Sequence, residues 1–532
     1  MLQFNRILFS YNLTYIYKIF LRVKYRFTNI FSILFLFSCI FFCADHADAN
    51  YITPGNGRNW NLDSLVLHSG GNVTYSGGIY YINDTITISW SDTLKIRTNA
   101  IVKLAALVFV DIRGVMRVIP PDSVMFTAID TTQMFYGFRL DSLSGSSIFK
   151  NMIFEWGNAV KLVGCDMIID SCTFRNNKQA SSFSGTVGGV INIFRSNPII
   201  SNCRIYRNRR AAIISSFNIP SSPRIINNLI FENDIDNYNT PQINLGAAGQ
   251  QPIIIRNNTI RGLYPMAGGI SIFPGGSVPL VIIENNKIKR NRYGIALLGT
   301  NIYALIRNNI IDSNTTQGIP YQGGSGINLN GKSSLVAKIS GNFIRWNLWG
   351  VTIQDSAKPS LGNILSTDTN DIGLNQIYGN YHNDTIPDLF NNTPDSVKAE
   401  NNWWGTTIVD SIEKHIFHKP DNPLLGFVDY IPFRLIAGIN ETVSVPEKFT
   451  FETFPNPFNA VQKIRYTIIE RGFYSIKISD LLGREVMTIK EGEMIPGKQE
   501  ALWNAETFSS GIYFCRITGM GVNGMQKLVL VK

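Results

Sequence analysis

The feature that most constrains the fold is a short motif, Asn-x-Ile-x-x-Asn, that recurs along the middle of the chain. Clear copies begin at Asn228, Asn286, Asn309, Asn342 and Asn375, and looser copies begin at Asn151, Cys172, Cys203, Asn258 and Asn402. Successive copies are 21 to 33 residues apart, with a mean near 28. A repeat of this length is typical of a solenoid in which each unit forms one coil.

Each unit contains three stretches with the alternation of a β-strand, separated by turn residues. A β-branched run such as residues 281–284 precedes the Asn, an alternating stretch follows it, and a third strand begins at a glycine, as in residues 294–297. No unit has the helix-forming stretches that helical repeats require. The sequence therefore predicts an all-β chain built as a parallel β-helix, with coils stacked about 4.8 Å apart and aliphatic side chains inside.

The repeat also predicts the position of individual side chains. The Asn residues are expected to stack at one turn as structural elements, not as catalysts. Cys172 and Cys203 occupy the same position in their units, where reduced, stacked thiols are expected instead of a disulfide. Arg256, Glu284 and Arg307 each precede an Asn by two residues, so they should face outward on successive coils as a ladder of alternating charge.

Residues from about 60 to 430 resemble the right-handed parallel β-helix superfamily, the pectate-lyase-like fold, and the handedness is implied by that resemblance. Trp403 and Trp404, with residues 426–433, look like the closing segment of such proteins, so we expect these rings to cap the last coil. Residues 50–150 are then the N-terminal cap and first coils, and residues 151–435 are the repeats with their C-terminal cap.

The N-terminal segment has the features of a secretory signal peptide. Basic residues up to Arg26 precede an apolar run from Ile30 to Cys43, and Ala47-Asp48-Ala49 offers a cleavage site. The run is short of the roughly 20 residues that span a bilayer, so no permanent transmembrane anchor is expected. Residues 1–49 are therefore assigned as the signal peptide.

Composition excludes several classes of site. The formal net charge is +10, but it is spread without a Lys/Arg run, so no nucleic-acid partner is expected. The mature chain keeps only four cysteines, too few for a disulfide scaffold, and the cysteines and histidines lack zinc-site spacing. No metal site is predicted, and no cofactor either, with Ca²⁺ left open.

Beyond a linker at residues 436–449, residues 450–532 alternate strands with turns, which predicts a small antiparallel Ig-like β-sandwich. Four motifs, at residues 454–459, 476–486, 510–517 and 527–532, together resemble the type A C-terminal sorting domain of the type IX secretion system of Bacteroidetes. The resemblance implies Sec export, the type IX machinery as a partner, and a secreted or outer cell-surface location. The motif residues are Pro455, Asn456, Pro457, Asp480, Gly483, Arg484, Gly511 and Tyr513.

Four units have long insertions between their second and third strands, and each insertion contains one aromatic residue. These residues are Phe183, Tyr238, Tyr264 and Tyr321, and Asp234 and Asp236 lie near the second of them. We expect the rings to cluster on one flank with the two acids at its edge, where they would bind an extracellular polysaccharide. The alternative is that each ring only anchors its own loop.

No catalytic residue can be assigned. A polyuronide lyase needs a cation and a base, for which Asp234 and Asp236 are candidate Ca²⁺ ligands and Arg207, Arg209 and Arg210 candidate bases, but their spacing is generic. The expected function is polysaccharide binding or processing, the latter by a lyase or glycoside hydrolase. The alternative is a noncatalytic structural or adhesive surface protein.

Overall fold

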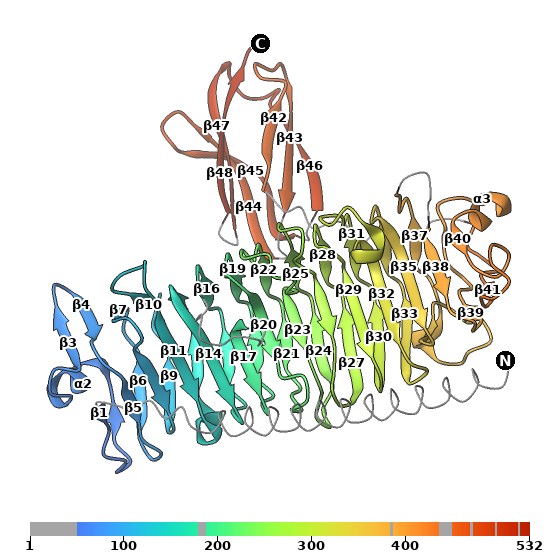
Figure 1. Cartoon of the computed structure of the whole chain (residues 1–532). Coiled ribbons are helices and arrows are strands. Elements are labelled where there is room, and N and C mark those ends of the chain that lie inside the picture. Colours follow the sequence, from blue (N-terminus) through green and yellow to red (C-terminus); the bar gives the residue numbers. More distant parts are fainter. Residues whose placement is uncertain are drawn as a thin grey trace, which may run out of the picture. The chain divides into compact units, whose positions relative to one another are not determined.

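The computed structural model describes residues 51–178, 188–382, 387–435, 449–468, 472–494, 497–519 and 522–532. The predicted signal peptide and nearly all of the predicted linker lie outside these residues. The chain divides into two compact units, Met1–Ala437 and Gly438–Lys532 (Figure 1).

The first unit is a parallel β-helix with three sheets, here called A, B and C, and each coil adds one strand to B, then C, then A (Figure 1). Sheet A contains β1 (Tyr51–Ile52), β5 (Ile86–Ile88), β8 (Phe109–Ile112), β11 (Phe135–Leu140), β14 (Gly157–Val163), β17 (Gly189–Phe194), β20 (Ala211–Ser215), β23 (Ile243–Leu245), β26 (Ile270–Ile272), β29 (Ile295–Gly299), β32 (Ser325–Gly331), β35 (Trp349–Asp355), β38 (Leu389–Asn392) and β40 (Ile416–Phe417). Sheet B contains β2 (Asn59–Trp60), β6 (Thr93–Ile96), β9 (Val115–Val118), β12 (Ile148–Lys150), β15 (Ile168–Asp170), β18 (Ile199–Ser201), β21 (Arg224–Ile226), β24 (Ile253–Arg256), β27 (Val278–Glu284), β30 (Ile302–Arg307), β33 (Leu335–Ser340), β36 (Lys358–Ser360), β39 (Val397–Lys398) and β41 (Val428–Asp429). Sheet C contains β3 (Val73–Ser76), β4 (Ile79–Ile82), β7 (Ala100–Leu104), β10 (Val124–Ala128), β13 (Met152–Glu155), β16 (Thr173–Arg175), β19 (Arg204–Tyr206), β22 (Leu229–Phe231), β25 (Thr259–Arg261), β28 (Lys287–Lys289), β31 (Ile310–Asp312), β34 (Phe343–Arg345) and β37 (Gln376–Tyr378).

Strands of successive coils pair in register, so equivalent side chains stack. Ile255, Ile283 and Ile306 are aligned on β24, β27 and β30, and all three are fully buried. Each such aliphatic side chain contributes about 1.5–3 kcal/mol on burial. One continuous apolar core therefore runs through the solenoid.

The predicted line of asparagines is confirmed. The backbone N–H and Nδ2 of Asn286 both donate to Oδ1 of Asn309, at 2.9 and 3.0 Å. The same two bonds link each member to the next from Asn228 through Asn258, Asn286, Asn309, Asn342 and Asn375 to Asn402. These buried amides satisfy the backbone at the turn between sheets B and C.

The two cysteines of the repeat continue this line. The Cys203 N–H donates to Oδ1 of Asn228 at 2.9 Å, and Cys172 and Cys203 are both buried and free. Burial raises the pKa of the Cys203 thiol well above its usual value. The expectation of reduced thiols instead of a disulfide is confirmed.

The predicted charged ladder is also present on sheet B. Glu284 accepts from Nε of Arg307 at 2.6 Å, and its other oxygen accepts from Arg256. Only 7% of the Glu284 side chain is exposed, because the two arginines cover it. The carboxylate lies outside the coil, as the strand alternation predicts.

Both ends of the solenoid are closed by short irregular segments. At the N-terminal end, α2 (Leu62–His68) is capped by the Asn61 side chain. At the C-terminal end, α3 (Val409–Glu413) follows Trp404, which is fully buried and packs edge-on against Tyr430. The described part of this unit also contains the 3₁₀ turns η1 (Ser142–Ser146), η2 (Pro320–Gln322) and η3 (Thr369–Asp371).

The second unit is a small antiparallel β-sandwich, as predicted. One sheet contains β42 (Phe451–Phe454), β43 (Val461–Ile468) and β46 (Gly497–Asn504), and the other contains β45 (Glu485–Met494), β44 (Gly472–Asp480), β47 (Gly511–Gly519) and β48 (Val522–Leu530). Trp503, Tyr466 and Tyr474 are the largest side chains in its own core.

The motif residues of this unit have identifiable structural roles. Asn456, between Pro455 and Pro457, pairs with β48: its Nδ2 donates to the Lys527 carbonyl at 2.6 Å, and its Oδ1 accepts from the Val529 N–H at 2.9 Å. Tyr513, on the strand that begins at Gly511, donates to the Ser509 carbonyl at 2.8 Å.

Candidate functional site

The described long insertions all lie on one flank of the solenoid, as predicted, because each joins a strand of sheet C to the next strand of sheet A. They follow β22, β25 and β31 and contain Tyr238, Tyr264 and Tyr321. The fourth insertion follows β16, and its Phe183 lies outside the described residues.

These insertions are joined to one another by hydrogen bonds. The Met266 N–H donates to Oδ1 of Asn237 at 2.7 Å. Arg292 donates from Nε to the Gln322 carbonyl at 2.5 Å and also to the Asn239 side chain. Together the insertions form a continuous wall along one edge of sheet A, here called the loop wall.

Beside the loop wall, the outer face of sheet A has a groove with a volume of about 400 Å³ that extends from β23 to β35. Its floor consists of outward-facing side chains, brought together by the strand register: the polar residues Asn244, Ser271, Asn328, Asn330 and Gln354, with the apolar residues Ala296 and Leu298 between them on β29. Asn330 is exposed, and Asn244, Asn328 and Gln354 are half-buried. The floor therefore offers amide groups to a ligand, while Ser271 is buried.

The edge of the groove opposite the loop wall carries an aromatic ring. Phe273 lines the groove with 49% of its surface exposed, and it packs against Phe217 with ring centroids 5.1 Å apart. Phe217 reaches it because residue 275 is glycine: a Cβ there would lie 2.3 Å from the Phe217 ring. The pair is thus held in place with an open face.

The groove carries little charge. Among the described residues that line it, none is Asp or Glu, and Arg292 is the only cation. The guanidinium is occupied by the two insertions that it joins. Burial raises the pKa of Tyr293, which also lines the groove, to about 12, so its hydroxyl is neutral at ordinary pH. The lining suits a neutral, hydroxyl-rich ligand better than acid–base catalysis.

Two of the predicted aromatic residues, Tyr238 and Tyr264, stand on the loop wall and not in the groove. Tyr238 is 69% exposed, with its ring 4.0 Å from the Arg210 guanidinium carbon, and Tyr264 is half-buried. Tyr321 lies in η2, between Pro320 and Gln322, which line the groove. Neither Tyr238 nor Tyr264 is among the groove-lining residues.

The expectation that Asp234 meets a ligand at the edge of the flank does not agree with its burial. Its side chain is fully buried and accepts hydrogen bonds from the N–H groups of Tyr238 and Thr240, both at 3.1 Å, so the carboxylate closes its own loop. Burial raises the pKa of Asp234. Asp236 forms ion pairs with Arg209 and Arg210, at 3.3 and 3.1 Å.

The candidate lyase residues are likewise engaged in structural contacts. Arg207 pairs with Glu232 at 3.2 Å, and Arg209 and Arg210 pair with Asp236. Within the described ranges no group of three or more His, Cys, Asp or Glu side chains is arranged to hold a metal ion. These residues therefore give no support to a Ca²⁺-dependent lyase site.

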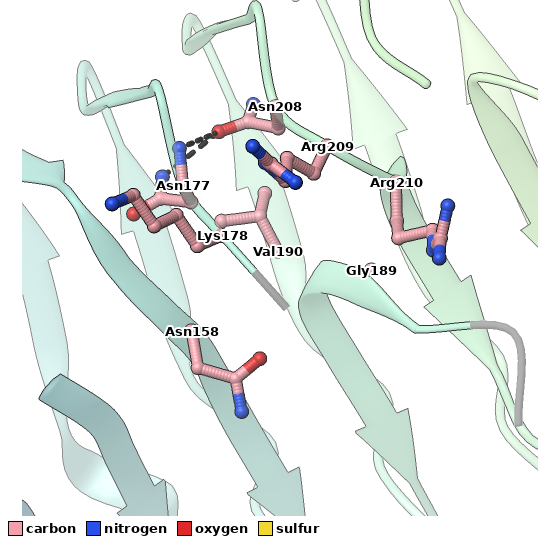
Figure 2. A pocket seen from close by; sticks show the side chains of 8 residues that line it. All are labelled: Asn158, Asn177, Lys178, Gly189, Val190, Asn208, Arg209 and Arg210. Carbon is pink, nitrogen blue, oxygen red and sulfur yellow. Dashed lines mark hydrogen bonds between the residues drawn. The ribbon is translucent and has the colours of Figure 1, made fainter. Parts of the chain in front are cut away.

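A second pocket, further along the same flank, is lined by Lys178, Arg209 and Arg210 beside the bonded pair Asn177 and Asn208 (Figure 2). Its volume is about 10 Å³, close to the space that one water molecule needs. It is too small for a sugar ring, so the groove on sheet A is the better candidate site.

Sequence reasoning missed the floor of the groove. The relevant pattern is the middle residue of each third strand, such as Ser271 between two buried isoleucines and Asn328 between Ile327 and Leu329. Strand alternation alone shows that these residues face outward. The outward asparagines Asn244 and Asn328 at this position of the unit could have identified this face.

Comparisons with known families agree with the two units. Residues 136–315 match the family described as right handed beta helix region, and residues 452–532 match the secretion system C-terminal sorting domain. No curated protein and no solved structure matches the chain. Among the described residues, no helix is both long and apolar enough to cross a bilayer. The chain is therefore a right-handed parallel β-helix protein with a type IX C-terminal sorting domain, which directs it to the cell surface or the medium.

Proposed function

We propose that the solenoid binds an extended, neutral extracellular polysaccharide in the groove on sheet A, without cleaving it. The observation that carries the proposal is a set of outward amides on β23, β32 and β35 in the same groove as the exposed ring of Phe273. Sugar hydroxyls exchange hydrogen bonds with amides, and the C–H faces of sugar rings pack on aromatic rings. No carboxylate among the described lining residues offers the acid or base of a hydrolase.

The dimensions of the groove favour a chain over a small molecule. It extends across β23, β26, β29, β32 and β35, which are five consecutive coils. At about 4.8 Å per coil, the floor is roughly 19 Å long, enough for about four sugar rings along the solenoid axis. The amide of Asn244 on β23 and the amides on β32 and β35 then contact different sugars of the chain, and Ala296 and Leu298 lie between them.

A structural role is the second candidate function, and the outer face of sheet C favours it. Tyr206 and Phe231 stack on each other with centroids 4.7 Å apart, and Arg261 lies over Phe231 at 5.3 Å. Because these groups cover one another's faces, they stiffen the surface instead of offering rings to a sugar. If the solenoid binds no ligand, its stiffened sheet C suits a rigid spacer, and the protein would be an adhesive or structural surface protein.

Affinity electrophoresis of the mature full chain separates the two functions. Gels contain xyloglucan, galactomannan, mixed-linkage β-glucan or polygalacturonate, and the proteins are the natural chain, Phe273→Ala and Trp90→Ala. Trp90 is a matched control, because it is 61% exposed and does not line the groove.

We expect at least one neutral polysaccharide to retard the natural chain and Trp90→Ala, and retardation to be largely lost in Phe273→Ala. Polygalacturonate should retard the chain less, because the only cation of the described lining is occupied. If no glycan retards the chain, or if Phe273→Ala is retarded normally, the binding function is rejected and the structural role is favoured.

A further inference from the structure

The turn between β44 and β45 in the sorting domain displays two adjacent leucines to solvent. Leu481 is 66% exposed and Leu482 is 76% exposed. Both belong to the turn that begins at Asp480 and ends at Arg484, two of the sorting-motif residues. A single exposed leucine is ordinary on a protein surface. Two adjacent exposed leucines at the tip of a turn indicate a contact with a partner.

The turn that presents these leucines is held by several hydrogen bonds and one ion pair. Oδ1 of Asp480 accepts from the N–H groups of Leu482 and Arg484, both at 2.9 Å, and Oδ2 accepts from the Arg484 guanidinium at 2.7 Å. The backbones of Asp480 and Arg484 pair at 3.0 Å, and the Gly483 N–H donates to the Asp480 carbonyl at 3.0 Å. The tip is thus held in one shape by bonds within the turn itself.

Gly483 also helps to fix the conformation of the turn. Its φ is +79°, and a Cβ at this position would meet nothing within 4 Å. The glycine is therefore required for the backbone conformation of the turn and not for room around it. Asp480, Gly483 and Arg484 all serve to fix the turn, and the leucines are the side chains that it displays.

We propose that the Leu481–Leu482 tip is the part of the sorting domain that the secretion machinery recognises, and that it inserts into an apolar socket of an outer-membrane component. The machinery is the partner that a sorting domain must meet on export. The charges at the tip favour an apolar socket, because Asp480 neutralises Arg484 and leaves the tip without net charge. A rigid turn loses little conformational freedom when it binds.

Export of the full chain in a host with a type IX system tests this proposal. The variants are Leu481→Asn with Leu482→Asn, Leu481→Met with Leu482→Met, and Leu502→Asn. Leu502 is the matched control, a leucine on β46 that is 57% exposed. The readouts are the fraction of the protein outside the cell and the unfolding temperature of each purified variant.

We expect the double Asn variant to accumulate in the periplasm with an unchanged unfolding temperature. Burial of each leucine in a socket corresponds to roughly tenfold or more in affinity, so the exported fraction should fall by at least that factor. The double Met variant and Leu502→Asn should be exported normally. Normal export of the double Asn variant, or an equal defect in Leu502→Asn, overturns the proposal.

A cross-linking measurement keeps the proposal testable if the double Asn variant does not fold. A photoreactive leucine analogue replaces Leu482 in the full chain, and cross-linked products are identified by mass spectrometry during export. A product with an outer-membrane component of the type IX machinery supports the proposal. Products with lipid only, with a second copy of the chain only, or with no partner overturn it.

Discussion

At the scale of single residues, the asparagine line shows how one side chain satisfies several buried groups at once. Nδ2 of Asn309 donates to the Ile283 carbonyl at 2.8 Å and to Oδ1 of Asn342 at 2.9 Å. Its Oδ1 accepts from the backbone and the side chain of Asn286. Alanine at this position would leave donors and an acceptor unpaired in a fully buried turn.

We predict that Asn309→Ala lowers the free energy of unfolding by about 3 kcal/mol or more, since each orphaned buried group costs about 1–3 kcal/mol. Urea unfolding followed by far-UV circular dichroism measures the change. Asn330→Ala is the control, because Asn330 is exposed on sheet A. A loss of less than about 1 kcal/mol for Asn309→Ala would show that the turn does not need the amide line.

The stability of the N-terminal cap is expected to depend on pH through the Asp92 carboxylate. Its carboxylate accepts from the N–H groups of Gly55 and Arg58, at 3.0 and 2.9 Å, and from Trp60 Nε1 at 3.1 Å. Burial raises the pKa of Asp92, but these hydrogen bonds outweigh burial and hold the pKa below its ordinary value. The stability that Asp92 provides is therefore present above its unfolded pKa of about 4 and is lost as the pH falls through the lower folded pKa.

We expect Asp92→Asn to melt at a lower temperature than the natural chain at pH 7, and the difference to shrink as the pH is lowered below about 4. Thermal unfolding at a series of pH values measures it. A difference that stays constant down to pH 2, or that grows with acid, would contradict the assignment.

Residue types and spacing could predict contacts within the repeat. They could not predict that the Asp234 carboxylate is buried in its own loop. The asparagine line and the Arg256–Glu284–Arg307 ladder follow from position in a fixed unit. Asp234 belongs to an insertion of irregular length, and its backbone has a φ of 64°, which turns its carboxylate inward onto its own loop. Such a turn depends on nonrepeating local bonds, which a sequence does not show.

At the scale of secondary-structure elements, the groove depends on how the insertions are joined. Arg292 connects the insertion after β31 to the insertion after β22 through Gln322 and Asn239. The side of the solenoid on which these insertions lie could be predicted, because they all occur at the same point of the unit. Their mutual contacts could not, because they join residues that are up to 53 positions apart in the sequence.

We predict that Arg292→Ala loosens the loop wall without unfolding the solenoid. Hydrogen exchange should accelerate in residues 318–324 and 237–240, and it should stay unchanged in the buried strands β26 and β29. Affinity for the polysaccharide retained by the natural chain should fall, since the ordering of the insertions would then oppose binding. Unchanged exchange in both insertions would show that Arg292 does not join them.

At the scale of the whole molecule, the sequence predicted the architecture of the solenoid because each repeat unit forms one coil. Each coil contacts mainly its neighbours, so a local period determines the stacking. The sorting domain has its own core, separate from that of the solenoid. The groove was not predicted, because it arises from five coils and several irregular insertions that meet only in space.

The central claim is that a polysaccharide chain lies along sheet A across five coils. Titration calorimetry tests it directly, with oligosaccharides of two to eight sugars derived from the polysaccharide that retards the natural chain most. We predict that affinity rises with length up to about four sugars and then levels off, because the floor is roughly 19 Å long. The rise should be lost in Phe273→Ala. Affinity that does not depend on length, or that is unaffected in Phe273→Ala, would contradict the claim.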